Sequence, residues 1–106
     1  MVDKIFILRD LEKYLRAQYK DSIKNVILFG SQAKGLADEN SDFDILIVLD
    51  NDYTGKEENE ILDICYEIDL KYNIFIDVHV LSLKELTSIR GKQPIFINAI
   101  NSGIYA

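Results

Sequence analysis

Several residue types are scarce in this 106-residue chain, which has one cysteine, one proline and no tryptophan. The single cysteine, Cys65, has no partner for an internal disulfide, which favours a reducing compartment. No apolar run approaches the roughly 18 residues that span a membrane. The N-terminus alternates charged and apolar residues in a helical rhythm, unlike a signal peptide. We therefore expect a cytoplasmic protein.

Positive charge is also in short supply. The chain has 12 Lys and Arg against 18 Asp and Glu, a net charge of −6, and its basic residues form no cluster. Nucleic-acid binding depends on clustered Lys and Arg that neutralise phosphates. This balance therefore argues against direct binding of nucleic acid unless a partner carries the positive charge.

Length and hydrophobic content indicate one domain. A chain of 106 residues with 48% hydrophobic residues can form one core but has no room for a second. We therefore expect a single domain over residues 1–106, and we expect little of it to be left for recognising a large second molecule.

Hydrophobic periodicity and capping signals predict an alternating order of elements. Capping boxes at Thr54 and Ser82 each open a helix, Pro94 opens another, and Gly103 ends it. Cys65 is expected on the buried face of its helix. The predicted helices are 4–19, 54–71, a short one after 82, and 94–103; the predicted strands are 25–29, 43–49 and 74–81. This order predicts an α/β (α+β) fold with a small mixed β-sheet and helices packed mainly on one face.

A turn suited to phosphate follows the first predicted strand. The apolar strand stops at Gly30, where a glycine lets the backbone turn sharply and approach a ligand. Ser31 supplies a hydroxyl and a backbone N–H. If residues 31–34 begin a helical turn, their free N–H groups favour phosphate oxygens, and Lys34 adds a positive charge.

Two carboxylates stand where the next strand begins. Asp42 and Asp44 are two residues apart, so on a strand both side chains face the same way, roughly 7 Å apart. Paired carboxylates suit Mg²⁺ or Mn²⁺ that is also held by substrate phosphates. An isolated Ser41-Asp42 would be a turn before a strand. The Gly30-Ser31 element ten residues earlier favours a phosphate-transfer site instead.

A third carboxylate lies in the last predicted strand. Asp77 is a lone acid in an apolar segment, and burying its charge without a metal, a donor or a cleft is costly. We place it in the same cleft as the other acids. His79 faces the same side two residues later; we expect a hydrogen-bonded structural histidine, with a supporting role beside the acids left open and no role as a ligand.

Taken together, these residues resemble the minimal nucleotidyltransferases of the polymerase-beta-like nucleotidyltransferase superfamily. The matched segments are 30–35 (GSQAKG), 41–45 (SDFDI) and 76–78 (IDV), and the likeness extends to the closing segment 94–105. The chain departs from the family pattern at Gln32, where an arginine is usual, and at Lys34, where a second arginine is common. A lost guanidinium weakens the grip on a triphosphate or changes the nucleotide preferred.

The resemblance implies a polymerase-beta-like fold and a Mg²⁺- or Mn²⁺-dependent transfer of AMP from ATP to a hydroxyl. In it, Asp42, Asp44 and Asp77 form the catalytic and metal-binding set, while Gly30, Ser31 and Lys34 bind the nucleotide. It also implies a helical HEPN toxin as partner, an antitoxin role in a hetero-oligomer, and a tyrosine as acceptor.

Two other classes of function stay open at this stage. The chain is also compatible with a non-catalytic binding module that neutralises its partner by occlusion, and the altered Gln32 favours this. A small-molecule nucleotidyltransferase, such as an antibiotic-modifying enzyme, needs an acceptor pocket for which the sequence offers no signal.

Overall fold

A four-stranded mixed sheet forms the centre of the computed structural model, which describes residues 3–35, 42–88 and 92–106. The strand order is β3-β2-β1-β4, with β2 parallel to β3 and antiparallel to β1, and β1 antiparallel to β4. The strands are β1 (Ile23–Phe29), β2 (Phe43–Leu49), β3 (Ile76–Ser82) and β4 (Ile104–Tyr105).

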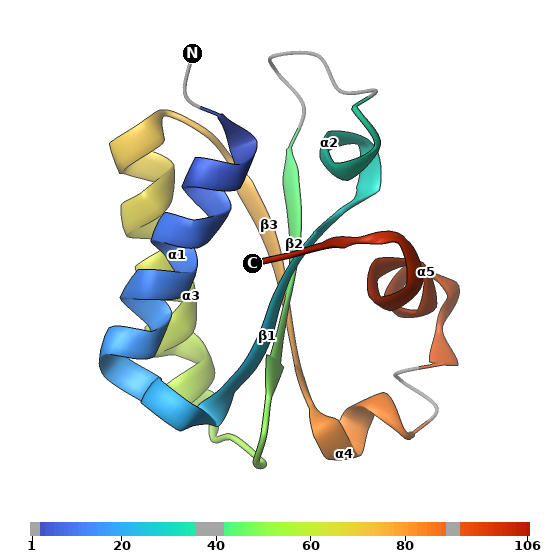
Figure 1. Cartoon of the computed structure of the whole chain (residues 1–106). Helices are drawn as coiled ribbons and strands as arrows, with labels where there is room; N and C mark the ends of the chain where they lie inside the picture. The colour runs from blue at the N-terminus through green and yellow to red at the C-terminus, as the bar shows by residue number, and fades with distance from the viewer. Residues whose placement is uncertain (1–2, 36–41, 89–91) are drawn as a thin grey trace.

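Helices cover both faces of this sheet unequally. The two long helices, α1 and α3, lie side by side on one face, and the shorter α5 lies on the other (Figure 1). The helical elements are α1 (Lys4–Tyr19), η1 (Lys20–Ser22), α2 (Gly30–Lys34), α3 (Gly55–Tyr72), α4 (Leu83–Leu86) and α5 (Pro94–Ser102). The predicted fold class, a small mixed sheet with helices mainly on one face, is confirmed.

The two faces carry separate hydrophobic clusters because strand side chains alternate between faces. Under α1 and α3 the larger cluster includes Leu11, Ile45 and Ile68, each fully buried. Under α5 the smaller cluster includes Leu46 and Phe96. The sheet thus has a hydrophobic cluster on each face, the larger one under α1 and α3.

The capping residues act as the sequence predicts. Thr54 and Ser82 each form a complete capping box, which satisfies free N–H groups in the first turn of α3 and of α4. Pro94 occupies the first turn of α5, and Gly103 follows its last residue. Cys65 is buried within α3, as expected, and burial raises the pKa of its thiol to about 12.

The structure differs from the prediction at the ends of two strands. The strand expected over 74–81 begins only at Ile76, because Asn73 adopts a left-handed conformation and Asp69 accepts hydrogen bonds from the N–H groups of Ile74 and Ile76. The strand expected over 25–29 begins earlier, at Ile23, which pairs with Leu49. The two-residue β4 was not predicted; its pairing with β1 is long-range, so no local pattern announces it.

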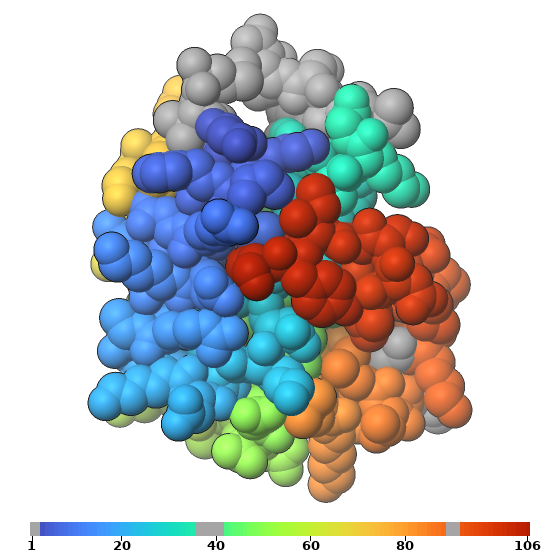
Figure 2. All heavy atoms as spheres, viewed as in Figure 1, coloured from blue at the N-terminus to red at the C-terminus, as the bar shows by residue number. Residues whose placement is uncertain are grey.

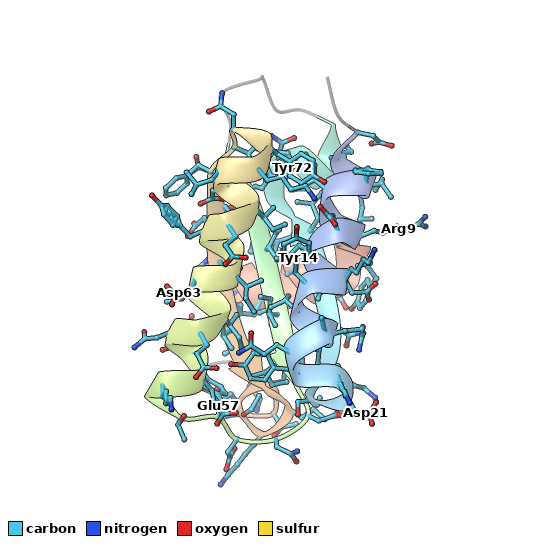
Figure 3. The ribbon with its side chains drawn as sticks, turned by 90° about the vertical axis from the view of Figure 1, so that its left-hand side faces the viewer. Arg9, Tyr14, Asp21, Glu57, Asp63 and Tyr72 are labelled. Carbon is cyan, nitrogen blue, oxygen red and sulfur yellow. The ribbon has the colours of Figure 1, made fainter. Side chains whose placement is uncertain are left out.

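Polar contacts hold α3 against α1. Asp10 accepts hydrogen bonds from Lys71 Nζ at 2.7 Å and from the Tyr72 hydroxyl at 2.5 Å. Tyr14 and Tyr72 lie between the two helices in Figure 3. At the other end of the pair, the Tyr19 hydroxyl donates to Glu60, and burial together with this contact raises the pKa of Tyr19 to about 12. Within the described ranges no helix is long and apolar enough to cross a membrane.

Neighbouring positions on α3 provide a test of the packing. Ile68 is fully buried, whereas Leu70 is 69% exposed. Ile68→Ala should lower the free energy of unfolding by about 2–5 kcal/mol, because it leaves a cavity in the larger cluster. Leu70→Ala should change it by less than about 0.5 kcal/mol. Urea unfolding monitored by circular dichroism gives both values, and similar losses for the two variants would contradict the described packing of α3.

Candidate functional site

The strand registers bring the predicted site residues to one end of the sheet. Phe29, the last residue of β1, pairs with Asp44 in β2, and Asp44 pairs with Asp77 in β3. Neighbouring strands lie about 4.8 Å apart, so the two aspartates are adjacent. Gly30 follows Phe29 directly, and Asp42 precedes β2 by one residue. The expected gathering of acids beside the glycine turn is therefore present in the structure.

These acids open toward α5. Asp44 and Asp77 alternate with Ile45 and Ile76, whose side chains lie in the cluster under α1 and α3. The carboxylates consequently belong to the opposite face of the sheet, which α5 covers only in part. Asp44 is half-buried, whereas the side chain of Asp77 is 52% exposed.

Gly30 turns the chain sharply beside Asp44. Its φ is +72°, a conformation that suits glycine, and an added Cβ would collide with Asp44 Oδ2. The backbone continues as the short helix α2, in which Ser31 is half-buried and Lys34 is exposed. Lys4 Nζ donates to the carbonyl of Gln32 at 2.6 Å, so α1 holds this turn in place. Residues 31–34 therefore form the helical turn that the sequence left conditional.

A cleft of about 330 Å³ lies between α2 and α5. In Figure 2 the C-terminal segment (red) lies next to the segment that contains α2 (teal). Three predicted residues line the cleft, namely Gly30, Lys34 and Asp44. The other lining residues are Phe29, Ala33, Ile95, Asn98 and Ser102. The cleft thus combines a cation, a carboxylate and an apolar wall.

Sequence reasoning missed the α5 wall of this cleft. Ile95, Asn98 and Ser102 have a spacing of three and four residues, which places them on one face of a helix. That spacing is legible in the sequence, but it does not show what this face of the helix contacts. These three residues line the cleft because α5 packs beside the end of β1, which is a tertiary contact.

The surroundings of Asp44 make its ionisation costly. Burial raises the pKa of Asp44 above its usual range, and the nearby charges of Asp77 and Asp42 raise it further. A bound cation would relieve this repulsion. Across the described residues, no three or more His, Cys, Asp or Glu side chains form a ready-made metal site. The donors present instead match Mg²⁺ sites in which one or two carboxylates share the ion with substrate phosphates.

The contacts of the His79 ring differ from those expected. Its ring lies between Phe29 and Phe96, with ring centroids 6.0 Å and 5.6 Å away, and its buried Nε2 has no hydrogen-bond partner within the described residues. The prediction of a hydrogen-bonded histidine is therefore wrong for Nε2, and the imidazole instead contacts two aromatic rings. Nε2 is 3.7 Å from Asp77 Oδ2, so the ring borders the acid cluster.

The remaining predicted positions divide between described and undescribed residues. Asp42 is exposed at the start of β2, two positions before Asp44 and on the same face. Ser41, which belongs to the family-like segment 41–45, lies outside the described residues. The structure thus brings together Gly30, Asp44 and Asp77.

The chain is similar to known proteins in sequence and in fold. A family model of the nucleotidyltransferase domain matches residues 8–104. Over 72 residues the chain is 42% identical to MJ0141 of Methanocaldococcus jannaschii, which bears the provisional name of protein adenylyltransferase. The aligned part covers 68% of this chain and 73% of MJ0141.

Two solved structures share the fold at low sequence identity. A crystal structure of the toxin–antitoxin MntA–HpeT with two aspartate-to-glutamate substitutions gives a TM-score of 0.62 at 14% identity, covering 92% of this chain and 69% of that chain. A toxin–antitoxin structure with AMP-PNP gives a TM-score of 0.58 at 15% identity, covering 91% and 69%. At such identities the likeness establishes the fold alone, and it confirms the expected fold class.

The raised pKa of Asp44 has a consequence for stability. The folded chain binds this proton more tightly than the unfolded chain does, so wild-type stability falls as pH rises through the titration range of the carboxyl. Without metal, Asp44→Asn should therefore unfold at a higher urea concentration than wild type at neutral pH. The difference should shrink as pH falls below the usual aspartate range.

Urea unfolding in EDTA across a pH series measures this effect. Asp63→Asn is the matched control, since it removes one carboxylate from the outer side of α3, on the opposite face of the sheet (Figure 3). An Asp44→Asn variant less stable than wild type at neutral pH would contradict the assignment of charge repulsion to this cluster.

Two glycines with the same backbone conformation allow the effect of backbone strain to be measured separately from the effect on the site. Gly30 and Gly35 have φ of +72° and +70°, but only at Gly30 would a Cβ meet Asp44; none of the described atoms lies within 4 Å of a Cβ at Gly35. Both Ala variants should lose about 1 kcal/mol from backbone strain. Gly30→Ala should in addition weaken ATP binding at least about tenfold by displacing the Asp44 carboxylate. Calorimetric titration with ATP and Mg²⁺ tests this, and equal affinities for the two variants would exclude the proposed closeness of turn and acid.

Proposed function

Because the chain belongs to the nucleotidyltransferase domain family, as a minimal nucleotidyltransferase, we propose that it transfers AMP from ATP to a hydroxyl of a partner protein. We propose further that the acceptor is a tyrosine of a HEPN-type toxin, which makes this chain an antitoxin. The observation that carries the proposal is the in-register pair Asp44 and Asp77 beside the Gly30 turn.

Residues in α2 and around the start of β2 would bind the nucleotide. Asp42 and Asp44 would hold Mg²⁺ or Mn²⁺ together with the triphosphate, and the cation would offset both the burial and the neighbouring charges that raise the pKa of Asp44. When bound, the ion neutralises phosphate charge and polarises the phosphorus under attack. Ser31 and the backbone N–H groups after Gly30 would contact the outer phosphates, and Lys34 would add a positive charge at the cleft.

Asp77 would act on the acceptor hydroxyl. In the transfer, the acceptor hydroxyl oxygen bonds to the α-phosphorus of ATP while the bond from that phosphorus to the pyrophosphate oxygen breaks. The hydroxyl proton passes to the Asp77 carboxylate, and pyrophosphate leaves. Asp77 suits this role because it is about half exposed, next to the half-buried Asp44, so a large acceptor can reach it.

The nature of the acceptor is supported by the similar proteins. MJ0141 carries the name of a protein adenylyltransferase, and the structures of similar fold are toxin–antitoxin complexes, one of them with AMP-PNP. The two aspartates substituted in the MntA–HpeT structure are two residues apart, the same spacing as Asp42 and Asp44. We infer that a protein hydroxyl is the acceptor here.

Intact-mass spectrometry tests the proposal. A HEPN-type toxin, the proposed partner, should gain the mass of one or more AMP groups when incubated with the chain, ATP and Mg²⁺. EDTA, or the variant Asp44→Asn, should abolish the gain. Tight binding of the partner with no added mass would favour neutralisation by occlusion, and brisk labelling of free sugars or small alcohols would favour a small-molecule acceptor.

The variant Asp77→Asn assigns the acceptor side within the same experiment. It should keep most of the ATP affinity, because Asp42, Asp44 and Ser31 remain, yet lose about two to four orders of magnitude in transfer rate. Single-turnover transfer and ATP calorimetry on one preparation give both quantities. Transfer within a few-fold of wild type would remove Asp77 from the mechanism.

A further inference from the structure

An apolar strip on the outer side of α3 takes no part in the site described above. Leu62, Tyr66 and Leu70 are 39%, 55% and 69% exposed, and Phe75, just beyond the helix, is 61% exposed. Exposed leucines and aromatic residues in such a series are uncommon on a surface that contacts only water. We refer to these four residues as the α3 strip.

The strip runs along the side of α3 that faces away from α1. Leu62, Tyr66 and Leu70 follow one another at intervals of four residues, so they lie in a row about 12 Å long. The positions of α3 that contact α1 are different ones: Glu60 accepts from Tyr19, and Lys71 donates to Asp10. The row therefore remains open after α1 and the sheet have packed.

The strip leads to the acids of the site. The carbonyl of Phe75 accepts a hydrogen bond of 2.9 Å from the N–H of Phe43, the residue between Asp42 and Asp44. Asp77 follows Phe75 by two residues and pairs with Asp44. Since β3 is the edge of the described sheet, a molecule lying on the strip reaches this end of the sheet from outside. The strip lies on the α1 and α3 side of the sheet and Asp77 faces the other side, so a partner on the strip would reach the exposed Asp77 carboxylate around the β3 edge.

The charges around the α3 strip indicate which kind of molecule would bind it. Asp63 and Glu67 are exposed beside the strip, on the solvent side of α3, and the whole chain carries a net charge of −6. Lys71, a basic residue near the same end of α3, is already paired with Asp10. A second copy of this acidic chain would bring like charges together, whereas Lys and Arg on a partner would be attracted.

We propose that the α3 strip is the docking surface for an amphipathic helix of the partner protein, with apolar residues flanked by Lys or Arg. Docking there presents the acceptor hydroxyl to Asp77. The inference rests on the proposed function, because it assumes that the acceptor belongs to a protein. An amphipathic helix fits because its apolar residues, three and four apart, form a matching row.

The test compares the double variant Tyr66→Ser/Leu70→Ser with Leu83→Ser, an exposed leucine at the start of α4. The probe is the HEPN-type toxin used in the mass-spectrometric transfer assay, titrated by calorimetry. The double variant should bind it at least about tenfold more weakly, whereas Leu83→Ser should bind like wild type. Both should keep wild-type ATP affinity. In the transfer assay, KM for the partner should rise while kcat stays within a few-fold.

The charge argument has its own measurement. Glu67→Lys should weaken partner binding and flatten its dependence on salt, because it removes an attractive charge beside the strip. Binding by Glu67→Lys as tight and as salt-dependent as wild type would overturn the basic character assigned to the partner. Circular dichroism of each variant confirms folding, and Leu70→Ser alone replaces the double variant if that protein does not fold.

Failure of this inference and failure of the proposed function give different results. Wild-type binding and transfer by the double variant would overturn the docking surface and leave the function standing. Partner binding that depends on the strip, but without AMP transfer by wild type, would sustain the surface and overturn the function. A dimer of the isolated chain that the double variant abolishes would assign the strip to a second copy and overturn the proposal.

Discussion

The parallel register of β2 and β3 places Asp44 beside Asp77, and the rest of the site depends on this pairing. Burial raises the pKa of Asp44, and the nearby charges of Asp77 and Asp42 raise it further. Such an arrangement is unfavourable in the empty protein and becomes favourable when a cation and phosphates occupy the site. The requirement for close approach extends to Gly30, where any side chain would collide with Asp44.

The unequal covering of the sheet decides where this site opens. Because α1 and α3 close one face completely at the level of Ile45 and Ile76, the acids can open only toward the face of α5. There, α5 leaves a cleft against α2, and the apolar and polar residues of α5 become its second wall. One layer of helices therefore supplies stability, whereas the other shapes the site.

The same packing leaves one side of α3 exposed. The buried side of this helix packs on the sheet, and Glu60 and Lys71 contact α1, which leaves Leu62, Tyr66 and Leu70 in solvent. Through Phe75 and its hydrogen bond to Phe43, this surface is joined to the strand that carries the acids. A nucleotidyltransferase that modifies a protein needs a surface for its acceptor as well as a site for its nucleotide, and the two features meet at the same end of the sheet.

The sequence by itself determined the local features of this protein. The helix 4–19 and the strand 43–49 have the predicted bounds, and the capping boxes at Thr54 and Ser82 form as expected, because periodicity and capping are properties of neighbouring residues. The glycine turn and the three acids were also legible as residue types at a given spacing. Only the tertiary structure decided the register of Asp44 with Asp77, the pairing of β4 with β1, the contacts of His79 with Phe29 and Phe96, and the wall that α5 adds to the cleft. Each of these joins segments far apart in the chain, and their relative placement follows from how whole faces pack, which no local pattern encodes.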